Sequence, residues 1–192
     1  MPLLVILAGL IAFTIKSTVA QAFYIPSGSM MPQLQVDDRV VVSKLAYRLH
    51  APRRGDIVVF DCPEAACRAR GRRAEPGNGV ARWLRSVGRG VGLVQPSTEE
   101  FIKRVVGLPG ETVEGRAGQV FIDGRRLVEP YLPAGTVTAD FPATAVPARH
   151  LFVMGDNRSA SSDSRVFGPI DRSLVVGRTI VRVWPPASAG FL

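Results

Sequence analysis

Ile25-Pro26-Ser27-Gly28-Ser29-Met30-Met31-Pro32 is the stretch around which the rest of the chain is organised, and it follows the only long apolar run. Each proline fixes its own φ and biases the residue before it toward extended backbone, so this segment is stiff and not helical. Gly28 lets the backbone turn closely between the two serines, which would present one hydroxyl and one amide on the same side. Alone, such a stretch is more typical of a loop that leaves a helix. Whether this stretch has a function beyond that of a loop must be judged together with the other segments of the chain.

The preceding segment, residues 1–24, is expected to be a transmembrane anchor. Residues 2–13 are nearly all apolar, and further apolar residues follow them. A helix from Leu3 to Tyr24 would be about 33 Å long, which is enough to cross a hydrocarbon core. The alternative is a removable signal peptide with a small-residue cleavage site at 20–22, but no positive charge precedes its apolar core. The permanent anchor is the favoured interpretation.

The charge balance bears on possible partners. The 192-residue chain carries 24 lysines and arginines against 16 acidic residues. Basic proteins of this kind often bind nucleic acid or anionic lipid. Nucleic acid is not expected here, because the sequence has no helix-turn-helix, zinc-finger spacing or aromatic RNA-binding motif. Lysine is limited to Lys16, Lys44 and Lys103, and this scarcity matters because arginine cannot supply an unprotonated amine.

Cys62 and Cys67 are the only cysteines, and four residues separate them. Two cysteines without a nearby histidine make a poor zinc site, so neither a metal ion nor another cofactor is expected. On the outer side of a bacterial membrane the pair can close a small disulfide loop. Two unlinked thiols are the alternative.

Short apolar runs after Pro32 predict β-strands. Glycine and proline punctuate these runs, and no long amphipathic helix follows the anchor, so residues 25–192 are expected to form a mainly β fold with antiparallel sheets. The strands are predicted within 36–43, 55–60, 101–106, 119–124, 151–154 and 175–184.

A basic insertion interrupts this pattern at about residues 61–97, where seven arginines stand against three acidic residues. Trp83, Leu84 and Val87 interleave with Arg82 and Arg85, which is compatible with a short amphipathic turn on anionic headgroups. A solvated loop is the other interpretation. The arginines are Arg68, Arg70, Arg72, Arg73, Arg82, Arg85 and Arg89.

The serines of the opening stretch raise the question of a base, because a serine hydroxyl is a weak nucleophile without one. Histidine is the usual base, but His50 and His150 stand in no recognisable catalytic setting. A lysine can take this role if burial disfavours its charged form and lowers its pKa toward neutrality. Lys103 lies within an apolar predicted strand, where an inward-facing side chain would be desolvated. It is favoured over Lys44, which is expected to be solvated at a strand end.

A third stretch follows the predicted strand at 151–154. Residues 154–165 read Met-Gly-Asp-Asn-Arg-Ser-Ala-Ser-Ser-Asp-Ser-Arg and are dense in hydroxyls, carboxylates and guanidinium groups. Alone, this stretch fits a polar loop, a cation site or a catalytic segment equally well, although its spacing does not match the EF-hand.

Taken in order, these stretches resemble the type I signal peptidase family in its bacterial serine/lysine form. An apolar anchor is followed by Pro-Ser-Gly-Ser-Met-x-Pro, then Lys-Arg and Gly-Leu-Pro-Gly-Glu, then Gly-Asp-Asn-x-x-x-Ser-x-Asp-Ser-Arg. The resemblance covers most of residues 22–60 and 100–168. It implies a membrane-bound serine endopeptidase that removes N-terminal signal peptides from exported preproteins after Ala-x-Ala-like sites.

The resemblance also implies a role for individual residues. Ser29 would be the nucleophile and Lys103 its general base. The Ser29 amide and the Ser27 hydroxyl would form an oxyanion hole. Ser161 would hydrogen-bond and orient the lysine amine. The remaining residues that it assigns are the supporting pair Asp163 and Arg165, the motif members Gly155 and Asp156, and Met30 and Pro32 beside the nucleophile, next to the substrate.

A location and a set of partners follow from the same resemblance. It implies a single-pass protein of the bacterial inner (cytoplasmic) membrane, with residues 25–192 as the catalytic domain on the periplasmic, outer side. Expected partners are preprotein signal peptides, membrane lipid and the secretion channel. The sequence departs from many bacterial relatives in its basic insertion, which stands where they have a short connection.

Other functions fit parts of the sequence. A dedicated peptidase for one conjugation or pilus precursor would carry the same motifs, so this alternative stays open. A self-cleaving repressor would carry a DNA-binding domain instead of the apolar segment. A membrane-tethered binding domain without activity is disfavoured, because both Ser29 and Lys103 are present. A mitochondrial relative fits the cysteine pair less well than a periplasmic enzyme does. Self-cleavage at 20–22 is a further hypothesis.

Overall fold

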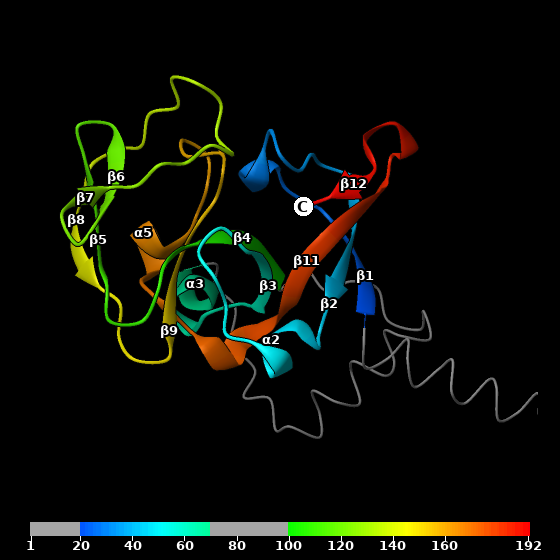
Figure 1. Cartoon of the computed structure of the whole chain (residues 1–192), viewed down its shortest axis with the longest axis horizontal. Helices are drawn as coiled ribbons and strands as arrows, with labels where there is room; N and C mark the ends of the chain where they lie inside the picture. Colours follow the sequence, from blue (N-terminus) through cyan, green and yellow to red (C-terminus); the bar gives the residue numbers. More distant parts are fainter. Residues whose placement is uncertain (1–19, 70–99) are drawn as a thin grey trace, which may run out of the picture.

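The structure is a computed structural model, and it describes residues 20–69 and 100–192. Its strands form two sheets (Figure 1), and every ladder between the described strands is antiparallel. The prediction of a mainly β, antiparallel fold is therefore confirmed. The larger sheet has the order β1 (Ala20–Tyr24), β2 (Arg39–Ser43), β11 (Val175–Trp184), β3 (Ile57–Asp61), β4 (Glu100–Gly107), β9 (His150–Met154) and β10 (Ile170–Asp171), with β12 (Gly190–Phe191) paired to β11.

The smaller sheet is built from one continuous part of the chain. Its order is β7 (Arg125–Arg126), β6 (Gln119–Ile122), β5 (Thr112–Arg116) and β8 (Phe141–Ala145). The turn between β6 and β7 contains Asp123 at φ 49° and Gly124 at φ 74°, which is the left-handed conformation that a tight hairpin turn requires. An Asp-Gly pair is typical of such a turn.

Short helices connect the strands. In the described part of the chain, the α-helices are α2 (Ala46–Leu49), α3 (Glu64–Ala69) and α5 (Ser164–Phe167), and the 3-10 turns are η1 (Gly28–Met30), η2 (Arg172–Leu174) and η3 (Pro186–Ser188). Within residues 20–69 and 100–192, no helix is long and apolar enough to span a membrane.

The start of the described chain corrects one prediction. The expected helix ran to Tyr24, but its last five residues, Ala20–Tyr24, form β1 and pair with β2. Phe23 is buried in the core while Tyr24 is exposed, so side chains alternate between the two faces as in any strand. Pairing with β2 therefore decides the conformation here. Residues 1–19, which carry the rest of the predicted anchor, lie outside the described residues.

Within residues 20–69 and 100–192, the core has three apolar clusters, which the strands separate. In β3, Ile57 and Val59 face the first cluster, while Val58 and Phe60 face the second, as the two-residue period of a strand requires. The third cluster joins the larger sheet to the smaller one and includes Phe152 of β9. The side chains of β4 after Glu100 are buried on both faces, because they pack into different clusters: Ile102 into the first, Phe101 and Val105 into the second.

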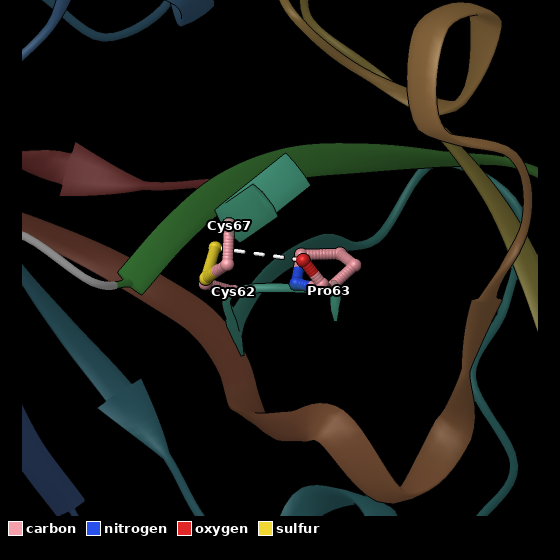
Figure 2. The surroundings of a disulfide bond; sticks show 3 residues. All are labelled: Cys62, Pro63 and Cys67. Carbon is pink, nitrogen blue, oxygen red and sulfur yellow. Dashed lines mark hydrogen bonds between the residues drawn. A yellow bond between two sulfur atoms is a disulfide. The ribbon is translucent and has the colours of Figure 1, made fainter. Parts of the chain in front are cut away.

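Cys62 and Cys67 form a disulfide that ties the end of β3 to α3 (Figure 2), with their Cα atoms 5.9 Å apart. The Cys67 amide also donates to the Pro63 carbonyl at 2.9 Å, which closes the first turn of α3. Ala66 of α3 packs into the second cluster. Arg68 forms an exposed ion pair with Glu64. Residues 70–99, which contain most of the predicted basic insertion, lie outside the described residues.

Candidate active site

Three segments far apart in the sequence meet beside β4. Lys103 lies on β4, Ser29 lies in η1, and residues 155–165 form the loop that follows β9. The β4–β9 register pairs Arg104 with Met154, so the start of the loop lies next to Lys103. The Lys103 Nζ is 2.7 Å from the Ser29 Oγ. The two residues predicted as base and nucleophile are therefore in hydrogen-bond contact.

Strand alternation explains where Lys103 points. Phe101 and Val105, two residues before and after it, belong to the second apolar cluster, so the Lys103 stem enters the same apolar layer. Only 3% of the residue is exposed. Its Nζ is 2.7 Å from the Ile102 carbonyl and 5.7 Å from the centre of the Phe101 ring. Burial of an amine among apolar groups disfavours its ammonium form.

The turn that carries Ser29, the predicted nucleophile, is held by the next residue in the sequence. Met30 is fully buried and packs with Leu34 in the first cluster, which fixes the turn that carries Ser29. Met30 therefore anchors the turn instead of lining an exposed surface, whereas Pro32 is exposed. Ser29 itself is half-buried, and the Ser27 hydroxyl lies 3.4 Å from the Ser29 Oγ. Both predicted hydroxyls thus lie on the same side of η1.

Gly155 lies where the loop packs closely against the turn that carries Ser29. A Cβ built on Gly155 would be 2.4 Å from the Ser29 carbonyl oxygen and 2.2 Å from the Ser161 Oγ. These distances are too short for any side chain, so only glycine fits without a shift of the loop. Gly155 thus lets the loop backbone contact the turn that carries Ser29.

The prediction for Ser161 is wrong in one respect. Its Oγ is buried and has no hydrogen-bond partner within the described part of the chain, so the expected bond to the lysine amine is not formed. Instead, the Lys103 Nζ contacts the Ser29 Oγ and the Ile102 carbonyl. The Ser161 hydroxyl lies beside Gly155, at the edge of the site.

Asp163 organises the loop from within. Its fully buried carboxylate accepts hydrogen bonds from the Gly155 amide at 2.9 Å and from the Arg165 guanidinium at 2.8 Å. It also caps α5 by accepting from the Arg165 amide. Burial alone would raise the pKa of Asp163, but the bonds and charge of Arg165, together with the Gly155 amide, hold it below the ordinary value of 3.8. The predicted Asp163–Arg165 pair is present.

Asp156 faces the other side of β4. Its carboxylate receives two bonds from Arg104, at 2.8 and 2.6 Å, and both side chains are buried. The guanidinium also donates to the Gly55 carbonyl and lies 4.0 Å from the centre of the Tyr131 ring. Asp156 therefore supports the loop by joining it to β4.

Two residues of the loop have contacts that the sequence did not suggest. The Asn157 amide donates to the Ser29 carbonyl, and its side chain donates to the Gly28 carbonyl, each at 3.1 Å. Arg158 is buried and bonded to Glu129 through two nitrogens, which docks the segment between β7 and β8 onto the loop. Asn157 ends the Gly-Asp-Asn part of the motif and Arg158 stands at the x position after it, but nothing in the sequence distinguishes their roles.

The other candidates lie apart from this site. The His50 and His150 rings contact carbonyls of nearby residues, those of Ala51 and Ala148. Lys44 directly follows the end of β2. Within residues 20–69 and 100–192, no group of three His, Cys, Asp or Glu side chains is arranged to hold a metal ion.

Comparison with known proteins identifies the family. A family model described as signal peptidase, peptidase S26, matches residues 1–184. Signal peptidase I of Leptolyngbya laminosa is 39% identical over 97% of this chain and 79% of its own length. That of Mycobacterium tuberculosis is 33% identical over 97% of this chain and 72% of its own length. A solved signal peptidase I from Enterococcus faecalis is 28% identical, with a TM-score of 0.45 over 67% of this chain and 97% of its own. The chain therefore belongs to the signal peptidase family, peptidase S26, and its activity is that of a type I signal peptidase, a serine endopeptidase.

Proposed function

We propose that Ser29 is the nucleophile and Lys103 the general base with which this peptidase removes N-terminal signal peptides from exported preproteins. The observation that carries the proposal is the 2.7 Å contact between the Lys103 Nζ and the Ser29 Oγ, made by a lysine that is only 3% exposed. A neutral amine at that distance can accept the hydroxyl proton as the serine attacks.

The reaction proceeds in two halves. The Ser29 Oγ attacks the scissile carbonyl carbon while its proton passes to the Lys103 Nζ. The negative charge that develops on the carbonyl oxygen is stabilised by the Ser29 amide and the Ser27 hydroxyl. The C–N bond then breaks, the Lys103 ammonium returns the proton to the leaving amine, and an ester remains on Ser29. Water attacks this ester with Lys103 as the base, which releases the signal peptide and restores the serine.

Burial explains why a lysine can serve as the base. A charged amine inside an apolar layer loses hydration, so the neutral form is favoured relative to its state in water. The neighbours Phe101 and Val105 supply apolar walls from the same face of β4. A site at the lipid surface would extend these walls and exclude more water.

The location and partners complete the proposal. The protein acts at the bacterial inner membrane as a single-pass protein, anchored by its N-terminal segment, with the catalytic domain on the outer side. Its substrates are preproteins that carry small residues, typically alanines, at the first and third positions before the cut. Membrane lipid and the secretion channel are its neighbours there. The apolar residues 2–13 support the anchor, and the Cys62–Cys67 disulfide supports an oxidising compartment.

The test is cleavage of a preprotein with an Ala-x-Ala site, in detergent, by the wild type and by Ser29→Ala, Lys103→Ala and Lys44→Ala. We expect cleavage after the last alanine by the wild type and by Lys44→Ala, and none by the other two. Activity that persists in Ser29→Ala would contradict the mechanism. A wild type that cleaves no general preprotein would contradict the broad specificity and favour a peptidase dedicated to one precursor.

A further inference from the structure

Asn157, in the loop after β9, is hydrogen-bonded to the turn that carries Ser29. This residue is half-buried and makes two bonds to consecutive carbonyls of η1: its backbone amide donates to Ser29, and its side-chain Nδ2 donates to Gly28, both at 3.1 Å. The Ser159 hydroxyl donates to the Asn157 Oδ1 at 3.2 Å, which leaves the Nδ2 facing Gly28.

The bond to Gly28 controls the direction of another group. The Gly28 carbonyl and the Ser29 N–H belong to one planar trans peptide and point in opposite directions. The Gly28 oxygen accepts two bonds, from the Met31 amide and from the Asn157 Nδ2, each at 3.1 Å. Rotating this peptide would break both bonds. The direction of the Ser29 N–H is therefore set by what holds the Gly28 oxygen.

The bond to Ser29 fixes the distance between loop and turn. The Asn157 amide contacts the Ser29 carbonyl directly beside Gly155, where the loop comes too close for a side chain. The loop in turn is fixed by the buried Arg104–Asp156 ion pair and by the hydrogen bond that the Gly155 amide donates to Asp163. Asn157 thus connects a rigid support to the one turn that carries the nucleophile.

We propose that Asn157 is a positioning residue, which aims the Ser29 amide at the developing oxyanion and holds the Ser29 hydroxyl beside Lys103. This inference rests on the proposed roles of Ser29 and Lys103. Asn157 acts through the backbone of Gly28 and Ser29. Its loss therefore reduces the stabilisation of the transition state more than it reduces the affinity for the substrate. Complete loss of an oxyanion donor lowers kcat by about 10²- to 10³-fold. A donor that is misdirected but still present is expected to lower kcat by a smaller factor, about 10- to 100-fold.

The experiment compares Asn157→Ala, which removes the Nδ2 donor, with Asn157→Asp, which keeps the shape but replaces the donor with an acceptor. Ser162→Ala, an exposed residue of the same loop, is the matched control. The kcat and KM are measured on an Ala-x-Ala peptide. Two ligands are then compared: a peptide aldehyde, which forms a tetrahedral adduct on the serine, and the same peptide with a reduced CH2–NH scissile bond, which has no carbonyl there.

We expect both Asn157 variants to lose kcat and aldehyde affinity by a similar factor, with KM and the affinity for the reduced peptide unchanged and the control like the wild type. A wild-type kcat in Asn157→Ala would overturn the inference, as would equal losses of affinity for both ligands, which indicate a general structural defect. If Asn157→Ala does not fold, Asn157→Asp decides by the same criteria.

Ser29→Ala, assayed in parallel, distinguishes a failure of the proposed Ser29 and Lys103 mechanism from a failure of the proposed role of Asn157. Activity retained by Ser29→Ala overturns the proposed mechanism and this inference together. An inactive Ser29→Ala beside a fully active Asn157→Ala overturns only the role of Asn157.

Discussion

Lys103 and Arg104 are consecutive cationic residues of one strand, both buried, yet their surroundings differ. Arg104 faces the side of β4 where the Asp156 carboxylate receives it through two hydrogen bonds. Lys103 faces the opposite, apolar side, where its Nζ contacts a hydroxyl and a carbonyl oxygen. One side of the strand thus matches a permanent charge with a carboxylate, and the other places an amine against a serine.

The difference shows how one strand can hold both a residue that stabilises the fold and a residue that is suited to act as a base. A guanidinium stays charged at any ordinary pH and matches a carboxylate in a planar fork, so it suits a buried structural pair. An amine can lose its proton when burial disfavours the charge, so it suits a base. The two residue types are therefore not interchangeable at these positions, and exchanging them tests the comparison.

The largest effect is expected for Lys103→Arg. The variant keeps the positive charge but cannot offer an unprotonated nitrogen, so kcat should fall by about 10²- to 10⁴-fold, the range for loss of a general base. The measurement is cleavage of an Ala-x-Ala peptide, with the folded state checked by circular dichroism. Lys44→Arg is the matched control and should be as active as the wild type. An active Lys103→Arg would remove the distinction between the two sides of β4.

The next effect concerns stability on the Arg104 side. Asp156→Ala leaves a buried guanidinium without its carboxylate, which is expected to lower the free energy of unfolding by about 3–5 kcal/mol. Urea unfolding measures this loss. Glu64→Ala, which removes the partner of the exposed Arg68, is the control and should change stability by no more than about 0.5 kcal/mol. Equal changes in the two variants would show that the buried pair contributes nothing special.

A smaller loss is expected for Gly155→Ala, at the contact between the loop and the nucleophile turn. The added methyl group would overlap the Ser29 carbonyl and the Ser161 hydroxyl, and the forced shift should cost about 1–3 kcal/mol of unfolding free energy. Activity should fall as well, because Ser29 moves relative to Lys103. Gly190→Ala, where a Cβ meets no atom within 4 Å, is the control. Wild-type stability and activity in Gly155→Ala would contradict this close contact.

The smallest effect is the pH dependence that Asp163 contributes. Its pKa is lower in the folded protein than the ordinary 3.8, so its stabilisation is complete above that value and is lost as the pH falls through the folded pKa. The unfolding free energy should therefore decline more steeply below about pH 4 in the wild type than in Asp163→Asn. Urea unfolding at a series of pH values measures both slopes. Identical slopes would show that Asp163 is not held in its charged form by Arg165 and Gly155.

Much of the fold could be predicted because the core strands are short apolar runs between turn residues. β2, β6 and β11 fall within predicted segments, and β3, β4 and β9 extend beyond theirs by no more than one residue at either end. β1 was missed because its composition continues an apolar run, and only pairing with β2 makes it a strand. β5 and β8 were missed for a related reason: sequences such as Thr-Val-Glu-Gly-Arg and Phe-Pro-Ala-Thr-Ala become strands by pairing with each other.

The candidate site could likewise be predicted only in part. The motifs indicated Ser29 and Lys103, and the structure brings them into contact because the position of Lys103 on an apolar strand fixes its direction. The contacts of Asn157 could not be predicted, since they are made with the carbonyls of Gly28 and Ser29, more than a hundred residues away in the sequence. The Ser161 prediction carried a hydrogen bond over from a motif, and that bond depends on side-chain geometry that a motif does not specify.

The most direct test of the central claim is to trap the covalent intermediate. The protein is mixed with an activated ester of an Ala-x-Ala peptide, quenched in acid and analysed by tandem mass spectrometry. The account predicts one acyl group, on Ser29, that forms in the wild type and not in Lys103→Met. An acyl group on another residue, or equally rapid acylation of Ser29 in Lys103→Met, would contradict the pairing of these two residues as nucleophile and base.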